Sequence, residues 1–484
     1  MNLELKDSWQ ILPYLSTIVA FYVLRRIWSY VKLRRFKGGP WTAISDVPHS
    51  RAMLGGNCHL FYAEANKKYG PIARVAPNIL VTSSAQVWAH VNNKPGYKRS
   101  DWYYNAARIE HRRDNVFSQT DNAKHEQRRK QMAPGYSGRE NHDLEAGIDE
   151  CLDQFLQLLH KKYLSSDDKV TPVDMARKVQ YFTLDVISKV GLGTAFGMLV
   201  ADKDVDDYLQ SSEEGLFIGN AALALGLSWL THMPWLGSFI APSPKDANGF
   251  GKMMSTCFRL VDERAANATE KRSDMLASFI RHGLSGHELR TEALEQIIAG
   301  SDTTATGIRV SLLHIMANPR VYRKLQDEID GAVRDGLAPA ADDGIIMAAQ
   351  ARQLPYLQAV IREALRLDPP VANIFSRDVP PGGDVVSVNG EDVFLPGGAC
   401  IGYSAYAMHH DNVVYGPDAD AFRPERWFEP DPDRLRAMTF TNELIFGHGK
   451  FQCLGKKVAQ MELSKLIFEI SDMWLQLAKR PNVV

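Results

Sequence analysis

A single cysteine near the carboxyl end of the sequence stands in a segment whose residue types suit metal binding. Cys453 and Phe446 belong to a stretch that reads FGHGKFQCLG, and a helical pattern begins directly after it. The N–H groups and the dipole at the start of a helix favour a charged sulfur. Glycines in the stretch leave room for a flat, bulky group such as haem, whose iron a thiolate activates for O–O cleavage. An isolated cysteine is by default a small buried hydrophobe, but the ten-residue spacing favours the ligand.

The pattern F-G-x-G-x-x-x-C-x-G resembles the signature of the cytochrome P-450 superfamily, the haem-thiolate monooxygenases. The resemblance implies that Cys453 is the axial ligand of the haem iron and that Phe446 packs beside the ligand loop. Many members carry Arg or His two residues before the cysteine, where it binds a haem propionate. This chain has Phe451 there, and Lys450 is the candidate substitute. The resemblance also implies a mainly α fold with small β-sheets (α+β), in which haem b lies between a long distal helix and the cysteine loop.

A second motif lies inside a long helical pattern, where residues 299–304 read AGSDTT. A threonine in mid-helix hydrogen bonds to the carbonyl one turn earlier and bends the helix, which together with Gly300 predicts a groove for dioxygen and water. The resemblance places this run across the distal face of the haem, with Thr303 as the catalytic hydroxyl and Asp302 as the acid that relays protons. Taken alone, an acid next to two threonines is also typical of a solvated helix face.

A third group is the pair Glu363 and Arg366, one helical turn apart, followed downstream by Arg426 in the stretch FRPERW. An isolated pair of this kind is common surface decoration that contributes a few tenths of a kcal/mol. In the family that the chain resembles, the three residues form a buried charge cluster that supports the haem loop. The resemblance therefore assigns Glu363, Arg366 and Arg426 a structural role.

Haem propionates need cationic partners, and the sequence offers three candidates besides Lys450. His125 and Arg129 share one face of a predicted helix, and the resemblance places both beside one propionate. Arg377 matches a strand arginine that reaches the other propionate. Lone arginines are mostly solvated, so these assignments depend on the resemblance.

The amino-terminal residues predict contact with a membrane. Residues 9–24 are almost wholly apolar, although a membrane span needs about 20 apolar residues. Snorkelling of Arg25 and Arg26 would extend the span, and the basic residues that follow predict a cytosolic main body. We expect a single-pass anchor with a basic flank over residues 1–37, in the endoplasmic reticulum membrane, and a catalytic domain over 38–484. A monotopic interfacial helix is the alternative, and the acidic residues before the apolar run disfavour a cleaved signal peptide.

Composition excludes several classes of protein. With 484 residues, 45% of them hydrophobic, the chain has material for a large core. A net charge of -1 gives no reason to expect nucleic acid as a partner. The five cysteines are scattered and odd in number, which argues against a disulfide framework and a zinc site and favours a reducing compartment.

Periodicity and turn residues predict the main elements. The patterns indicate a β-hairpin at 72–75 and 79–81 and a second sheet segment within 371–405. The resemblance implies that the apolar stretch 215–240 forms a lid over a lipophilic pocket. Helices are expected at 144–162, 174–190, 285–317, 319–333, 353–367 and 454–470.

The expected partners follow from charge and from the resemblance. Lysines 450, 456, 457 and 465, with Arg128 and Lys130, predict a basic face that would steer an acidic flavoprotein. The resemblance implies electrons from NADPH through a separate cytochrome P-450 reductase, with cytochrome b5 as a second donor. An ordinary solvated basic face fits the charge pattern equally well.

Three functional hypotheses follow. The first is a membrane-anchored monooxygenase that oxidises a lipophilic small molecule, similar to fungal microsomal members of secondary metabolism. The second is a haem-binding product with impaired catalysis, because only 31 residues follow Cys453 and the family's closing hairpin would be missing. The third, a relative that rearranges peroxides, is disfavoured by the acid–threonine pair at Asp302 and Thr303.

Overall fold

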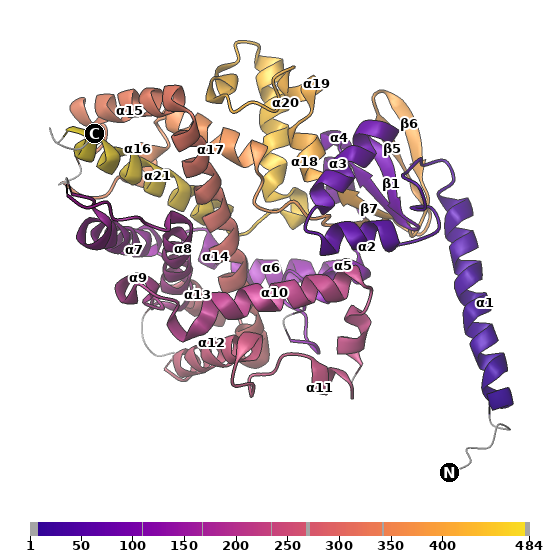
Figure 1. The fold of residues 1–484 in the computed structure, drawn as a ribbon. Coiled ribbons are helices and arrows are strands. Elements are labelled where there is room, and N and C mark those ends of the chain that lie inside the picture. The colour runs from indigo at the N-terminus through magenta and orange to yellow at the C-terminus, as the bar shows by residue number, and fades with distance from the viewer. Residues whose placement is uncertain are drawn as a thin grey trace. The chain divides into compact units, whose positions relative to one another are not determined.

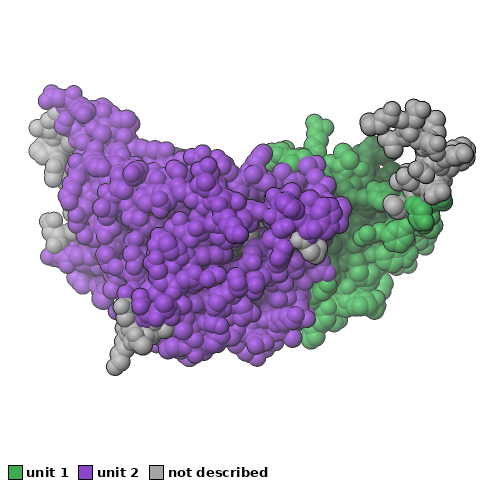
Figure 2. Space-filling view, turned by 90° about the horizontal axis from the view of Figure 1, so that it is seen from below, with its two compact units in different colours: residues 1–100, 372–408 green, residues 101–371, 409–484 purple. Residues whose placement is uncertain are grey.

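A computed structural model gives the structure of residues 8–479, apart from Ile109, Asp167, Pro234, 268–271 and 341–342. The chain divides into two compact units, shown in green and purple in Figure 2. The first unit joins residues 1–100 to residues 372–408, and the second joins 101–371 to 409–484. The predicted division into an anchor over 1–37 and a catalytic domain over 38–484 stays a prediction.

The first unit contains both β-sheets. Five strands form one sheet in the order β1-β2-β7-β4-β3, and the remaining two form a hairpin. The strands are β1 (Ile72–Ala76), β2 (Ile79–Thr82), β3 (Lys98–Arg99), β4 (Arg377–Asp378), β5 (Asp384–Val388), β6 (Glu391–Leu395) and β7 (Cys400–Tyr403). Strands β1, β2 and β7 are buried along their whole length, and most of their residues are apolar. The predicted hairpin and the predicted second sheet segment are both confirmed.

The longer helices of the first unit are α1 (Ser8–Lys32), α2 (Val47–Leu54), α3 (Cys58–Tyr69) and α4 (Ala85–Asn93), and the last three pack against these strands. A buried arginine of β1 fastens the end of α1 to the sheet. The Arg74 guanidinium donates to the carbonyls of Ser29 at 3.1 Å and Pro77 at 2.6 Å. Leu33, directly after α1, is fully buried.

The part of α1 before this junction exposes apolar side chains, including Phe21 and Leu24 at 68% and 64%. Among the described residues, however, no helix has both the length and the apolar character that a membrane crossing needs. The single-pass span predicted from the sequence therefore finds no support in the described residues. The physical reason is that Arg25 and Arg26 end the apolar run within the helix.

The second unit is helical. Its longer helices are α6 (Asn122–Tyr136), α7 (Leu144–Leu158), α8 (Met175–Leu192), α10 (Tyr208–Ala224), α12 (Gly249–Ala266), α13 (Met275–Arg281), α14 (Gly286–Ala317), α15 (Pro319–Arg334), α17 (Pro355–Leu367), α20 (Pro432–Glu443) and α21 (Lys456–Lys479). Short helical pieces connect them, among them α11 (Gly237–Ile240). The predicted helices at α7, α8, α14, α15, α17 and α21 are all confirmed, and Pro319 occupies the first turn of α15 as expected. The chain is therefore mainly α with small sheets, as predicted.

Helix α14 forms the centre of the second unit and contacts α8, α12, α17 and α21 (Figure 1). Gly307 permits the close approach of two neighbours, since a Cβ there would lie 3.1 Å from Leu365 and 3.3 Å from Leu463. A Cβ at Gly300 would lie 2.7 Å from side-chain atoms of Ile187 on α8. The prediction that Gly300 opens a groove is therefore wrong, because Ile187 fills that space and the glycine serves helix packing.

Candidate functional site

The loop between α20 and α21 places a cysteine at a helix N-terminus. The N–H of Cys453 donates to the carbonyl of Phe446 at 2.7 Å, and this hydrogen bond closes the loop. Gly447 has a φ of +73°, and a Cβ at this position would lie 2.8 Å from the carbonyl oxygen of Phe451. The turn therefore requires a residue without a side chain. The motif read from the sequence forms one compact local structure.

The sulfur of Cys453 lies where opposing electrostatic effects meet. Its side chain is accessible to solvent, although protein surrounds it closely enough for burial to raise the pKa of the thiol. The N–H groups of Gly455 and Lys456 and the charge of Arg129 act in the opposite direction. Burial has the largest effect, so the helix end alone does not produce the thiolate that the sequence suggested. A coordinated metal cation would, because it deprotonates the thiol that binds it.

Helix α6 carries two of the predicted propionate partners. His125 is buried and its ring lies 5.3 Å, centre to centre, from the ring of Phe451 in the cysteine loop. Arg129 is half-buried, and among the described residues it makes no ion pair, although its charge acts on Cys453. Burial lowers the pKa of the Arg129 guanidinium and the charge of Cys453 raises it. The structure thus brings His125 and Arg129 to the cysteine loop.

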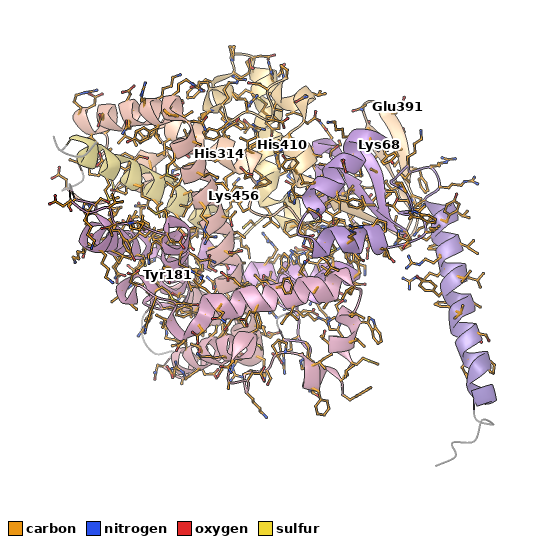
Figure 3. The ribbon with its side chains drawn as sticks, in the orientation of Figure 1. Lys68, Tyr181, His314, Glu391, His410 and Lys456 are labelled. Atoms are coloured by element: carbon orange, nitrogen blue, oxygen red, sulfur yellow. The ribbon has the colours of Figure 1, made fainter. Side chains whose placement is uncertain are left out.

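Two lysines lie on the aromatic residues of the loop. The ammonium of Lys450 lies 5.0 Å from the ring centre of Phe451. Lys456, labelled in Figure 3 at the start of α21, pairs with Glu443 and lies 5.5 Å from the ring centre of Phe446. Both are cation–π contacts, which hold the lysine heads near the loop.

Arg377 belongs to the first unit, where it is almost fully buried on β4. Its guanidinium donates to the carbonyls of Phe375 and Ser376 at 2.7 and 3.1 Å. The same group lies 5.3 Å from the ring centre of Trp88. The other candidate residues belong to the second unit, so the propionate role of Arg377 stays a prediction.

The acid–threonine pair lies in the middle of α14. The hydroxyl of Thr303 donates to the carbonyl of Ala299 at 2.8 Å, which is the bond one turn back that the sequence predicted. Asp302 is exposed to solvent, and its Oδ1 accepts a hydrogen bond from Gln180 of α8 at 3.1 Å. The carboxyl group therefore has access to water on one side and a fixed donor on the other.

Glu363, Arg366 and Arg426 form a cluster in which all three side chains are buried. Arg366 donates two hydrogen bonds to the Glu363 carboxylate, at 2.8 and 2.9 Å, and Arg426 donates one at 3.2 Å. The indole of Trp427 adds another at 3.0 Å. Arg426 also pairs with Asp418 at 3.0 Å, which balances the second positive charge. The cluster ties α17 to the segment that leads into α20 and the cysteine loop.

These residues fit the haem that the resemblance implies. Cys453 offers one accessible soft ligand, which haem iron accepts from a protein. Arg129 offers a half-buried cation without an ion pair in the described part of the chain, which suits a propionate carboxylate. A haem held there would receive Cys453 as its axial ligand.

The basic face predicted for a flavoprotein partner is smaller than the sequence suggested. Lys465 is fully buried and pairs with Glu145 at 2.6 Å and Asp149 at 2.8 Å, so that part of the prediction is wrong. Arg128 is largely buried between Glu288 and Glu292. Lys457 remains exposed and Lys130 remains largely exposed. Helical spacing alone does not distinguish an exposed lysine from one that faces a buried carboxylate.

Sequence reasoning missed three polar residues that support the site. Gln180 and Arg309 contact each other near Asp302, and they come from helices more than a hundred residues apart. Glu292 of α14 binds Arg128 of α6 at 2.5 Å and the N–H of Val116 at 3.0 Å. Burial raises the pKa of Glu292 to about 7. The only signal for Glu292 in the sequence was an acidic residue inside an apolar helical pattern.

Comparisons with known proteins point to one family. The family profile described as Cytochrome P-450 matches residues 37–470. The cytochrome P-450 monooxygenase ABA1 of Pyricularia oryzae is 40% identical, over 94% of this chain and 90% of its own length. The monooxygenase aba1 of Botryotinia fuckeliana is 34% identical, over 87% of this chain and 82% of its own. The monooxygenase mpaDE' of Penicillium brevicompactum is 29% identical, over 93% of this chain and 53% of its own.

Replacing Glu363 tests the charge cluster. We expect Glu363→Ala to lower the free energy of unfolding by about 3–5 kcal/mol, because it leaves the buried Arg366 guanidinium without its carboxylate and Arg426 with Asp418 alone. Urea denaturation and the haem content of the purified protein measure the effect. The control is Asp433→Ala, which removes an exposed partner of Arg436 and should leave both unchanged. Normal stability and haem content in Glu363→Ala would contradict the assignment.

The raised pKa of Glu292 predicts a pH dependence of stability. An acid whose pKa rises from 4.5 unfolded to about 7 folded binds more protons in the folded state between these values. Stability therefore falls as pH rises from about 4.5 to about 7. Glu292→Gln should remove this part of the slope, whereas Glu288→Gln, an exposed partner of the same arginine, should retain it. Urea titrations across this range decide the matter, and equal slopes in wild type and Glu292→Gln would refute it.

Proposed function

The chain belongs to the cytochrome P-450 family and is a monooxygenase, and from that premise we propose that it inserts one oxygen atom of dioxygen into a lipophilic small molecule of fungal secondary metabolism. The observation that carries the proposal is the accessible sulfur of Cys453. The backbone N–H of this residue donates to the Phe446 carbonyl, and the N–H groups of Gly455 and Lys456 face its sulfur. Relatives from three fungi that bear monooxygenase names support the assignment.

The proposed division of labour follows from the positions of the residues. Bound haem would supply the dioxygen chemistry, with electron density donated by the Cys453 thiolate. Arg129 and His125 would orient the cofactor from α6, with Lys450 beside them on the loop. The Glu363 cluster would keep the loop in place.

Proton delivery falls to α14. Asp302 is exposed and takes up a proton from water, and the hydroxyl group of the neighbouring Thr303 is held by its hydrogen bond to the carbonyl of Ala299. Because the Thr303 hydroxyl donates its hydrogen to the carbonyl of Ala299, its oxygen lone pairs remain available to accept a hydrogen bond from a donor such as water. This arrangement suits general acid catalysis, in which the acid delivers protons to the reacting oxygen.

We propose that electrons come from NADPH through a separate cytochrome P-450 reductase. The exposed Lys457 and Lys130 support docking of an acidic partner, although they form a smaller basic face than the sequence suggested. Cytochrome b5 would be a second donor to the same face.

We also propose that the protein associates with the endoplasmic reticulum membrane. Two apolar surfaces support this, one on each unit. The first is the exposed side of α1, with Phe21 and Leu24. The second lies on the segment that includes α10 and α11, where Phe217, Trp235 and Phe239 are 70%, 66% and 84% exposed. Aromatic side chains of this kind favour the interface between lipid and water.

The catalytic proposal is tested with the reconstituted holoenzyme, reductase and NADPH. Lipid extracts of a fungus that makes secondary metabolites serve as substrates, and the reaction is run under isotopically labelled dioxygen. We expect a product that carries one labelled oxygen atom and forms only when all components are present, because one atom of dioxygen enters the substrate. Cys453→Ser should abolish it. Product formation without labelled oxygen would contradict the proposal.

The membrane proposal is tested by flotation with vesicles of neutral and anionic phospholipid. We expect the double variant Trp235→Ser and Phe239→Ser to bind at least about tenfold more weakly, because each side chain loses apolar burial in the lipid. Val413→Ser is the matched control, since Val413 is 92% exposed on another surface of the same unit. Unchanged binding of the double variant would exclude this surface from the contact.

A further inference from the structure

A chain of hydrogen bonds fixes the carboxyl group of Asp302 from the side of α8. Gln180, which precedes the Tyr181 labelled in Figure 3, is buried and donates from Nε2 to Asp302 Oδ1 at 3.1 Å. Its Oε1 accepts a hydrogen bond from Nη2 of Arg309, which lies on α14 two turns beyond Asp302. Arg309 in turn donates to the carbonyl of Ala176 at 2.8 and 3.0 Å. Every polar atom of the Gln180 side chain is therefore engaged.

This network admits only one orientation of the Gln180 amide. A guanidinium group has donors and no acceptor, so it can face only the oxygen of the amide. The NH2 group must then face Asp302, and a flipped amide would place oxygen against carboxylate and NH2 against guanidinium. Arg309 thereby orients the Gln180 amide so that its NH2 group donates to Asp302.

Several charged groups surround the network. Asp174 and Arg177 of α8 and Glu213 of α10 act on Arg309, as does Asp302 itself. Arg177 and Glu213 pair with each other at 3.4 Å. Gln180 is the neutral residue between Asp302 and Arg309, and its NH2 group donates the hydrogen bond that Asp302 accepts in this network.

We propose that Gln180 is a positioning residue for proton delivery, which holds the Asp302 carboxylate in one solvent-facing arrangement and is itself oriented by Arg309. This inference rests on the proposed role of Asp302 as the proton relay. A hydrogen bond donated to a carboxylate favours its ionised form. After Asp302 has passed a proton inward, the amide stabilises the ionised carboxylate that the next proton from water must reach.

The test uses the holoenzyme with reductase and NADPH, and needs no substrate. The measured quantity is the fraction of NADPH electrons that leaves as hydrogen peroxide, across neutral pH, together with its change in heavy water. Haem content and the spectrum of the carbon monoxide complex confirm that each variant holds its cofactor. Asp302→Asn tests the proposed function first, and it should raise the peroxide fraction several-fold at every pH.

Gln180→Glu tests the inference. Glutamate keeps the contact with Arg309, but it loses the donor to Asp302 and places a second negative charge beside it. The midpoint of the curve of peroxide fraction against pH should therefore move upward by about one unit. Gln180→Met removes the donor without adding charge and should give a smaller shift in the same direction. The methionine variant decides the question if the glutamate variant does not fold.

Gln296→Glu is the matched control. Gln296 is another buried glutamine between α14 and α8, where its amide nitrogen would lie 3.2 Å from a Cβ at Gly191, and it should leave the midpoint unchanged. If Asp302→Asn raises peroxide release but both Gln180 variants retain the wild-type midpoint and isotope effect, the inference is wrong and the proposed function stands. If Asp302→Asn has no effect, the role of Asp302 and the inference fall together.

Discussion

The hydrogen bond from the Cys453 N–H to the Phe446 carbonyl closes the loop on which the rest of the site depends. It sets the sulfur at the start of α21, where helix N–H groups face it and burial opposes its ionisation. The chain that leads into α20 and the loop is held by the buried carboxylate of Glu363, which accepts hydrogen bonds from Arg426 and from the indole of Trp427. The Glu363 cluster thus supports the position of Cys453 without contacting it, because breaking a buried ion pair strongly destabilises the fold.

Helix α14 combines two requirements that conflict in most helices. It must be buried, because the core of the second unit forms around it, and it must also admit protons. Glycines at 300 and 307 permit its neighbours to pack closely, while Asp302 between them stays exposed to water. The acid therefore reaches solvent without a polar channel through the core, and Gln180 supplies the donor that an exposed carboxylate would otherwise take from water.

Much of this site was predictable because its signals are local. The cysteine loop lies within ten residues, the helix boundaries follow apolar periodicity, and the resemblance named Arg426 as the third member of the Glu363 cluster. Long-range pairings left no such trace. Nothing in the sequence indicates that Lys465 faces Glu145, that Ile187 fills the space beside Gly300, or that Gln180 meets Asp302. Each depends on which helix faces fold together, and single-sequence periodicity does not determine that.

The most direct measurement concerns the bond between the Cys453 sulfur and haem iron. The purified protein is reduced and exposed to carbon monoxide, and the position of the main haem absorption band is recorded. We predict the long-wavelength band that thiolate-bound haem gives, and its loss in Cys453→Ser. A wild-type protein without that band, or a serine variant that keeps it, would contradict the account.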